Sequence, residues 1–410
     1  MSIIRILLYF TLILSSQILY SQQDWFQIPS PSNYPLSGIY FKNFNSGVVG
    51  GYKTTNGGQT WLVPNINNDN YSLSFPDSNT GYLIGHVYFY KTTNFGNDWL
   101  LLNRPNGLFF GTYFCNIYTG YVCGSKIIKT TNGGLNWTIQ PIPLSQNYEL
   151  YNIFFTDLNN GFAVGSTYTG PPDSSVIIKT TNGGISWNVQ SFYSPVDRYL
   201  HSIYFITPNT GFLGGKQYIY KTTDAGSTWL YKSSMTSNII NSIYFPNNLT
   251  GFGVCNYGDI IKTTNAGDSW FKQNSLTSND LLSVYFINNN YGYISGVGNK
   301  ILKTTNGGGP PIGIRPMNNE MPKSFELYQN FPNPFNPTTK INYDLPKDAK
   351  VSIIFYDILG RQMLKLVNDE FQKAGKYSLT FNGQPFASGV YFYRLVSDKY
   401  VEVKKMLLIK

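Results

Sequence analysis

Carboxylates are the side chains of this sequence from which a hydrolytic site could most readily be built. A glycosidase needs two of them about 5–10 Å apart, one on each side of the bond that it cleaves. Several acids lie in turn sequences such as PDSNT (76–80) and TDLNN (156–160), where Asp commonly binds the local backbone. Residues 22–308 hold twelve acids, among them Asp69, Asp77, Asp98, Glu149, Asp157, Asp173, Asp197 and Asp280. We assign no catalytic residue and keep a glycoside hydrolase as the alternative.

Histidine and cysteine give little support for a metal site or an activated nucleophile. The sequence has two His, His86 and His201, and three Cys, with no CxxC pair. Both kinds of site need several such residues brought together. Cys115 and Cys123 flank one predicted hairpin and could form a disulfide, but we favour free thiols, because buried Cys behaves as a small apolar residue. We expect no metal ion and no cofactor.

The formal net charge of +9 does not indicate a nucleic-acid site. Such a site needs a basic patch interleaved with exposed aromatic residues. Here seven of the Lys residues recur at regular intervals along the chain, and the aromatic residues fall at predicted core positions. We therefore expect an evenly distributed charge and no nucleic-acid partner.

An internal repeat dominates the middle of the sequence. The segment Lys-Thr-Thr begins at seven positions with spacings of 38, 38, 50, 42, 41 and 41 residues. In the first six copies a Trp follows eight residues after the Lys. The seven Lys residues are Lys53, Lys91, Lys129, Lys179, Lys221, Lys262 and Lys303, and the six Trp residues are Trp61, Trp99, Trp137, Trp187, Trp229 and Trp270.

Each repeat unit predicts four short strands. A segment such as HSIYF (201–205) is followed by a turn and by a Gly-aromatic segment such as GFLGG (211–215). The strand that ends in Lys-Thr-Thr comes next, then an Asn-Gly-Gly turn and a strand that begins with Trp. Alternating apolar residues and Asn-Gly are typical of antiparallel hairpins. Four strands in about 40 residues is the size of one propeller blade.

The repeat resembles two known kinds of propeller repeat. TTNGGQTW (54–61) is similar to the Asp-box of sialidase-type repeats, with Asn in the Asp position, and the copy at 222–229 has Asp224 itself. The whole unit, from Gly-Tyr or Gly-Phe to Trp, is more similar to the repeats of photosystem II assembly and stability factors. The resemblance covers roughly 25–308 and implies a propeller scaffold, not one activity. A sialidase would need three Arg, and this region has only Arg104 and Arg198.

The seventh repeat lacks a Trp, because Pro311 stands in its place. Trp25 is the one Trp outside the six pairs, and it precedes the first unit. A propeller must close its ring, since an open one exposes strand edges. We expect residues 22–30 to complete the last blade beside residues 297–305. This gives seven blades. In the first blade only six positions separate Gly47 from Lys53, so we expect its third strand to be shortened or irregular.

Two other segments of this region depart from the repeat. The fourth unit contains the insertion 166–176, which we interpret as a surface loop, with a recognition element as the alternative. The N-terminal residues 1–21 have Arg5 before a mostly apolar stretch, which is typical of a signal peptide. A membrane anchor is less favoured, because the apolar stretch is shorter than the roughly 20 residues that span a bilayer.

The repeats end at a Pro/Gly/Asn-rich linker, 309–324, and residues 325–410 have a different pattern. Alternating segments such as KVSIIFYD (350–357) and GKYSLTFN (375–382) predict a small antiparallel, Ig-like β-sandwich. The segment NFPNPFNPTT (330–339), the segment SGVYF (388–392) and the final KMLL (405–408) closely resemble the type A sorting domain of the type IX secretion system. That resemblance implies export through the outer membrane by the type IX machinery.

The sequence thus predicts an all-β protein with a signal peptide at 1–21, a seven-bladed β-propeller at 22–308, a linker at 309–324 and a sorting domain at 325–410. We expect no transmembrane segment in the mature chain, and a place outside the cell or anchored on its outer surface. The expected function is non-catalytic binding of a protein or a glycan, and the ligand is not indicated by the sequence.

Overall fold

The computed structural model describes residues 24–67, 72–144, 147–167, 174–190, 199–309, 315–316, 322–372, 374–383 and 386–409. The predicted signal peptide lies outside these ranges, as do residues 168–173 of the insertion and most of the predicted linker. Within the described residues, no helix is long and apolar enough to cross a membrane.

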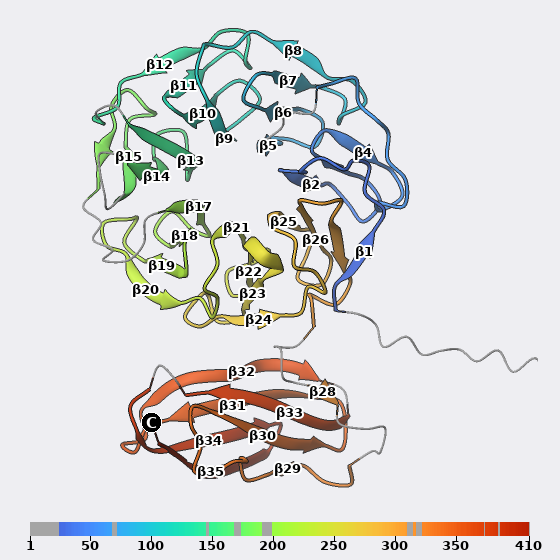
Figure 1. The fold of residues 1–410 in the computed structure, drawn as a ribbon, viewed down its shortest axis with the longest axis vertical. Helices are drawn as coiled ribbons and strands as arrows, with labels where there is room; N and C mark the ends of the chain where they lie inside the picture. The colour runs from blue at the N-terminus through green and yellow to red at the C-terminus, as the bar shows by residue number, and fades with distance from the viewer. Residues whose placement is uncertain are drawn as a thin grey trace, which may run out of the picture.

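Residues 26–304 form seven antiparallel sheets, and Figure 1 shows them arranged around a central opening. One short 3-10 turn, η1 (Asn256–Gly258), interrupts the sixth sheet. The strands of the seven sheets, in chain order, are β1 (Phe26–Ile28), β2 (Ile39–Phe41), β3 (Gly47–Val49), β4 (Tyr52–Thr54), β5 (Ser72–Ser74), β6 (Gly81–Ile84), β7 (Phe89–Thr92), β8 (Leu100–Leu102), β9 (Phe109–Phe114), β10 (Gly120–Gly124), β11 (Ile127–Thr130), β12 (Thr138–Gln140), β13 (Tyr148–Phe155), β14 (Gly161–Thr167), β15 (Ser174–Thr180), β16 (Asn188–Val189), β17 (Leu200–Phe205), β18 (Gly211–Gly215), β19 (Tyr218–Thr222), β20 (Leu230–Ser233), β21 (Ile240–Tyr244), β22 (Gly251–Cys255), β23 (Ile260–Thr263), β24 (Phe271–Gln273), β25 (Leu281–Phe286), β26 (Gly292–Gly296) and β27 (Ile301–Thr304).

The first strand of each repeat unit lies nearest the central opening (Figure 1). We call these seven the inner strands: β2, β5, β9, β13, β17, β21 and β25. Each inner strand contacts the inner strands of the two neighbouring sheets, and β2 contacts both β5 and β25. The ring of sheets is therefore continuous, as expected for a propeller.

The N-terminal strand closes the ring, as predicted from the missing Trp. β1 pairs antiparallel with β27, with Phe26 opposite Lys303 and Ile28 opposite Ile301. Trp25 is fully buried, and its ring lies edge-on to Phe286 at 5.8 Å. Its Nε1 donates a hydrogen bond of 3.1 Å to Oε1 of Gln273 on β24. The seventh Trp position is thus filled from the other end of the chain.

The short first unit forms the one incomplete sheet among those described. β2, β3 and β4 pair in order, but a single bridge between Lys53 and Leu62 replaces the fourth strand. β3 and β4 have three residues each and are joined directly through Gly50 and Gly51. Both glycines have positive φ, of 53° and 92°, which other residues rarely adopt. The predicted shortening of the third strand is confirmed.

Aromatic stacks hold neighbouring sheets together. The Phe that ends an inner strand stacks on the aromatic residue of the preceding sheet's second strand, as Phe205 does on Phe162 at 4.7 Å. Trp229 lies edge-on to the same Phe205 ring at 6.0 Å. Such contacts bury large apolar areas in favourable ring geometries. The glycine that opens each second strand makes room, since a Cβ on Gly211 would lie 2.6 Å from the Phe205 ring.

The C-terminal residues form a sandwich of two four-stranded sheets, ordered β28-β33-β30-β29 and β32-β31-β34-β35. Its core contains the fully buried rings of Tyr343, Phe355 and Tyr393. The strands are β28 (Arg315–Pro316), β29 (Glu326–Leu327), β30 (Thr338–Leu345), β31 (Ala349–Tyr356), β32 (Gln362–Gln372), β33 (Gly375–Asn382), β34 (Gly389–Ser397) and β35 (Tyr400–Leu408). The predicted β-sandwich is confirmed.

Candidate functional site

The Asn-Gly-Gly turns that recur in the repeats are held by their own side chains. In the first turn, Oγ1 of Thr54 accepts from the N–H of Gly58 at 2.9 Å, and Oδ1 of Asn56 accepts from the N–H of Thr60 at 2.9 Å. Asp224 serves the turn of the fifth sheet in the same way, through the N–H of Thr228 at 2.9 Å. We call these segments the repeat turns. Their Thr, Asn and Asp residues have a structural role.

The last repeat turn is completed across the ring closure by a residue that sequence reasoning missed. In other turns the Asn amide donates to the residue before the Trp, as Nδ2 of Asn182 does to Oγ of Ser186 at 2.9 Å. In the last turn, Nδ2 of Asn306 donates to Oδ1 of Asp24 at 3.2 Å. Asp24 precedes Trp25 as Ser186 precedes Trp187, and this parallel was visible in the sequence.

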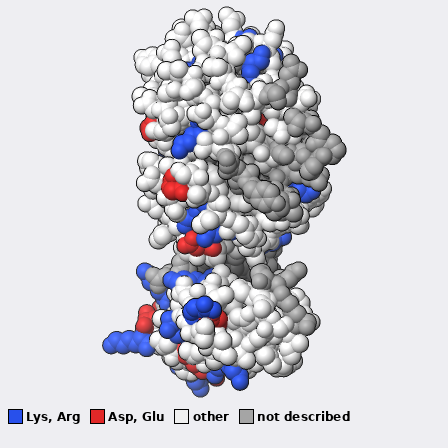
Figure 2. Space-filling model, turned by 90° about the vertical axis from the view of Figure 1, so that its left-hand side faces the viewer, with Lys and Arg blue, Asp and Glu red and all other residues white. Residues whose placement is uncertain are grey.

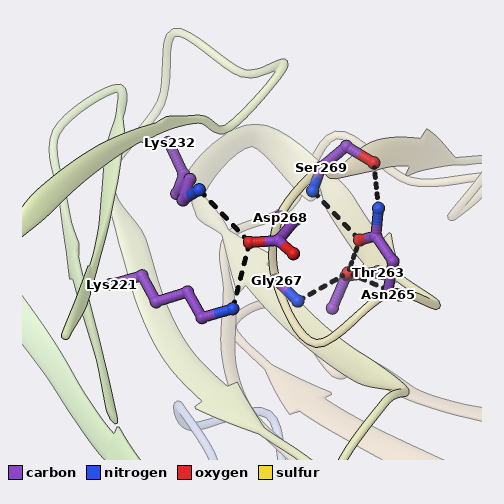
Figure 3. A network of polar contacts seen from close by, with 7 residues as sticks. All are labelled: Lys221, Lys232, Thr263, Asn265, Gly267, Asp268 and Ser269. Atoms are coloured by element: carbon purple, nitrogen blue, oxygen red, sulfur yellow. Dashed lines mark hydrogen bonds and ion pairs between the residues drawn. The ribbon is translucent and has the colours of Figure 1, made fainter. Parts of the chain in front are cut away.

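Six of the repeated Lys residues tie their sheet to the repeat turn of the next sheet. Nζ of Lys221 lies 3.0 Å from Oδ1 of Asp268, and Nζ of Lys232 lies 3.2 Å from the same oxygen (Figure 3). Nζ of Lys303 donates to the carbonyl oxygen of Gly57 and so joins the last sheet to the first. The same link is made by Lys53, Lys91, Lys129 and Lys179.

These Lys residues therefore do not form a free basic ring. Nζ of Lys221 also lies 5.9 Å from the centre of the Phe212 ring, in a cation–π arrangement. Burial lowers the pKa of Lys91 and of Lys303. On the side drawn in Figure 2, the described residues of the propeller show scattered charges rather than a continuous basic patch.

The described carboxylates of the propeller that the sequence singled out bind local donors. Oδ1 of Asp157 accepts from the N–H groups of Asn159 and Asn160 at 2.7 and 2.9 Å. Together with the Asn160 amide, these donors lower the pKa of Asp157. Asp280 accepts from the N–H of Tyr257 at 2.8 Å, and Glu149 accepts from the Tyr151 hydroxyl at 3.0 Å.

The other acids that the sequence singled out either bind nearby groups or lie outside the described residues. Asp77 binds its own turn, and Asp98 accepts from the Asn94 amide at 2.8 Å. Asp69, Asp173 and Asp197 lie outside the described residues. Within the described part of the chain, no group of three or more His, Cys, Asp or Glu residues could hold a metal ion.

The cysteines and histidines do not come together as a reactive site in the described residues. Cys115, Cys123 and Cys255 are free thiols, which agrees with the favoured interpretation. Burial raises the pKa of Cys115 to about 12, so this thiol is protonated at neutral pH. Burial lowers the pKa of His201 to about 4, so its imidazole is neutral. Neither residue has the electrostatic setting of an activated nucleophile.

A ring of aromatic side chains surrounds the central axis near the ends of the inner strands. We call it the axial ring: Tyr40, Tyr113, Phe154, Tyr204, Tyr244 and Tyr285. Successive rings lie 4.9 to 5.6 Å apart, centre to centre, from Tyr113 round to Tyr40. In the second sheet, Ser74 takes the same position, and its Oγ accepts from the N–H of Phe114.

The axial ring offers an aromatic surface with hydroxyl groups at its edge. Burial raises the pKa of Tyr113 and of Tyr285 to about 12, so both phenols keep their protons. The hydroxyl of Tyr244 donates to the carbonyl oxygen of Phe286. The sequence already indicated this ring. In six of the seven units, the residue directly before the Phe at the end of the first strand is aromatic. Its arrangement around the axis, interrupted by Ser74 in the second sheet, became visible only in the fold.

Comparison with known proteins places the sorting domain and the propeller in context. Residues 329–410 match the family model of the secretion system C-terminal sorting domain. The domain indicates export through the type IX secretion system to the cell surface or beyond it. A search of curated proteins found no match to this chain.

Solved structures share the propeller fold at low sequence identity. YCF48, in a structure with a bound D1 peptide, has 17% identity and a TM-score of 0.56 over 69% of this chain and 97% of its own. PorZ, a surface component of the type IX secretion system of Porphyromonas gingivalis, has 13% identity and a TM-score of 0.52 over 92% of this chain and 58% of its own. A GH74 xyloglucanase from Xanthomonas campestris has 9% identity and a TM-score of 0.55 over 78% and 59%. At these identities the similarity shows the fold alone.

Proposed function

We propose that the propeller is a non-catalytic binding module for a protein or glycan, which the sorting domain delivers outside the cell. The observation that carries this proposal is the use of the repeated polar side chains inside the fold. The repeat Lys, Thr and Asn residues, with Asp224 and Asp268, hold turns and join sheets. The aromatic residues around the axis are partly exposed, although the hydroxyls of Tyr204 and Tyr244 donate to the carbonyl oxygens of Phe245 and Phe286, and aromatic side chains are favoured at binding surfaces.

The proposal also includes the division of the chain. A signal peptide at 1–21 would be removed, and residues 22–308 would act as the propeller, joined by a linker at 309–324 to the sorting domain at 325–410. Asp24 and Trp25 support this division, because both are used in the closed ring just after the predicted cleavage position. Mass spectrometry of the N-terminal peptide of the exported protein tests it.

An array experiment tests the binding function. The exported protein, purified from culture medium or released from the cell surface, is applied to arrays of glycans and of surface proteins. We expect saturable binding to at least one class of ligand and no change in the ligand afterwards. Absence of binding on both arrays, with a correctly folded protein, would contradict the proposal. The bound D1 peptide of YCF48 supports the use of this fold for peptide recognition, but it does not identify a ligand for this chain.

Glycoside hydrolysis is the second candidate function. The similarity of the fold to that of a xyloglucanase favours it. This function predicts soluble reducing sugars when the protein is incubated with a panel of polysaccharides. If reducing sugars are released, and the release is lost when one carboxylate of a facing pair is substituted, the protein is a glycoside hydrolase and the binding proposal is wrong.

A further inference from the structure

Five inner strands carry a β-bulge near the end where they begin. The pairing register with the second strand shifts by one residue in each, so the inner strand holds one extra residue between two paired positions. Bulges re-aim a side chain and are frequent next to functional sites. The five extra residues are Phe110, Tyr151, His201, Asn241 and Leu282. We call them the bulge arc.

The bulge arc is the place where the repeat units differ in chemistry. The residue before each bulge is a large apolar side chain that is fully buried: Phe109, Leu150, Leu200, Ile240 and Leu281. The bulged residue itself is partly exposed and is aromatic, imidazole, amide or aliphatic. A position needed only for the fold would repeat, as the buried one does. The bulged position is therefore the same in each of these five strands, while the side chain that occupies it differs from strand to strand.

Local packing explains why the bulge forms. Gly165 ends the repeat segment of β14 opposite the bulge at Tyr151, and a Cβ there would lie 1.8 Å from the carbonyl oxygen of Glu149. Gly124 and Gly296 meet the carbonyl oxygens of Leu108 and Asp280 in the same way. Glycine thus lets the inner strand approach closely where it takes up the extra residue.

The aromatic members of the arc contact one another from sheet to sheet. The Tyr151 and His201 rings are stacked at 4.4 Å with 12° between their planes. Phe110 lies 5.5 Å from Tyr151, and His86, from the turn before β7, lies edge-on to Phe110 at 5.1 Å. The result is a row of four rings across the second to fifth sheets. It lies at the opposite end of the inner strands from the repeat turns.

Polar groups accompany this row of rings. Glu149 accepts from the Tyr151 hydroxyl at 3.0 Å, and Nδ2 of Asn152 donates to the carbonyl oxygen of His201 at 3.4 Å. In the next sheet, Nδ2 of Asn241 donates to Oδ1 of Asn256 and to the carbonyl oxygen of Leu281. Burial lowers the pKa of His201 to about 4, so its imidazole is uncharged at neutral pH. Partly exposed aromatic rings, amides and one carboxylate thus lie close together at this end of the inner strands.

We propose that the bulge arc, with His86 and Glu149, is a binding site for an uncharged polysaccharide. This inference rests on the proposed binding function and names its ligand class and place. The negative faces of aromatic rings suit the weakly positive C–H faces of sugar rings. The carboxylate and amides suit hydroxyl groups, which both donate and accept. An anionic glycan or peptide is disfavoured at the row of rings itself, because it would meet the carboxylate of Glu149 there.

Affinity electrophoresis of the full exported protein tests this site. Native gels contain xyloglucan or galactomannan as uncharged probes, or polygalacturonate as an anionic one. We expect the uncharged probes to retard the wild-type protein. The variant Tyr151→Ala should bind about ten-fold more weakly or worse, since a central aromatic contact is removed. Tyr151→Phe keeps the ring and should retain most of the binding.

Tyr118→Ala is the matched control. Tyr118 is 60% exposed and lies at the opposite end of the propeller, where its carbonyl oxygen accepts from the N–H of Gly133 in a repeat turn. This variant should bind like the wild type, and all variants should keep the wild-type circular dichroism spectrum and a cooperative unfolding transition. A folded Tyr151→Ala variant that still binds the uncharged probes overturns the site.

The remaining outcomes separate this inference from the proposed function. Retardation by polygalacturonate alone overturns the uncharged ligand class. Binding only to a protein on the surface-protein array leaves the binding function standing and overturns the glycan site. Absence of binding to every probe and array overturns both.

Discussion

At the scale of single residues, the closure of the propeller depends on Asp24 and Trp25. Trp25 fills the Trp position of the last sheet, and Asp24 fills the position before it. Gln273 links the two ends of the propeller, because its Nε2 donates to the carbonyl oxygens of Gly307 and Gly308 while its Oε1 accepts from Trp25. A buried polar group of this kind is costly when it loses its partner.

Replacement of Trp25 by Ala should destabilise the propeller by roughly 3–5 kcal/mol, because a fully buried large side chain leaves a cavity. Urea unfolding followed by tyrosine fluorescence or circular dichroism measures this loss. Trp61→Ala is the control, since Trp61 is partly exposed beside the incomplete first sheet, and it should cost clearly less. Equal melting of Trp25→Ala and wild type would contradict closure by β1.

Asp224 makes the stability of the fifth sheet depend on pH. Its pKa is lowered to about 2 by hydrogen bonds from the side chain and the N–H of Thr228 and from the Thr222 hydroxyl. A lowered folded-state pKa contributes stability that is present above the unfolded pKa of about 3.9 and is lost as the pH falls toward 2.

The variant Asp224→Asn should fold, because six other repeat turns have Asn in this position. We expect wild type to be the more stable of the two at pH 6 and to lose that advantage between about pH 4 and pH 2. Urea midpoints of both proteins at several pH values measure the difference. A difference that stays constant down to pH 2 would show that the Asp224 carboxylate is not stabilised by its turn.

At the scale of strands and turns, most neighbouring sheets are joined by the same three kinds of contact. An aromatic stack, a Trp edge and a Lys that reaches the next repeat turn recur around the ring. A strand pair alone is marginally stable in water, so the contacts between neighbouring sheets supply much of the stability of each sheet. This explains why a side chain as polar as Lys recurs at a fixed position: its stem covers an aromatic ring and its ammonium group finds acceptors.

Lys221→Met should destabilise the propeller by about 1 kcal/mol or less, because the ion pair with Asp268 is partly exposed to water. Lys232→Met removes the other partner of Asp268, but Nζ of Lys221 also lies over the Phe212 ring. The loss at Lys221 should therefore exceed the loss at Lys232. Chemical unfolding at low and high salt measures both, and salt should reduce the two losses. A larger effect at Lys232 would contradict the cation–π contribution.

At the scale of the whole molecule, the chain combines a closed propeller with a sorting domain that indicates the type IX secretion system. Closure removes the strand edges that would otherwise favour aggregation outside the cell. The sorting domain has its own core, built around Tyr343, Phe355 and Tyr393.

Removal of residues 325–410 should abolish appearance of the propeller in the medium and on the cell surface, while the propeller accumulates in the periplasm. Immunoblots of the cell fractions measure this distribution. As a control, residues 309–410 fused to an unrelated periplasmic reporter should direct the reporter outside the cell. Export of the truncated propeller at the wild-type level would contradict the role of the sorting domain.

The sequence by itself determined the fold class, the repeat, the closing strand and the sorting domain. It could do so because each repeat has its own strand and turn patterns. In addition, the last unit lacks a Trp and a spare Trp precedes the first unit, so Trp25 can be assigned to the last sheet. Only the tertiary structure revealed which members of the axial ring and of the bulge arc lie side by side, because these residues are about 40 positions apart in the sequence, and those of the arc also depend on register shifts between strands. The glycine at this point recurs in the sequence, as at Gly165, but the close approach of the inner strand that goes with the bulge is seen only in the fold.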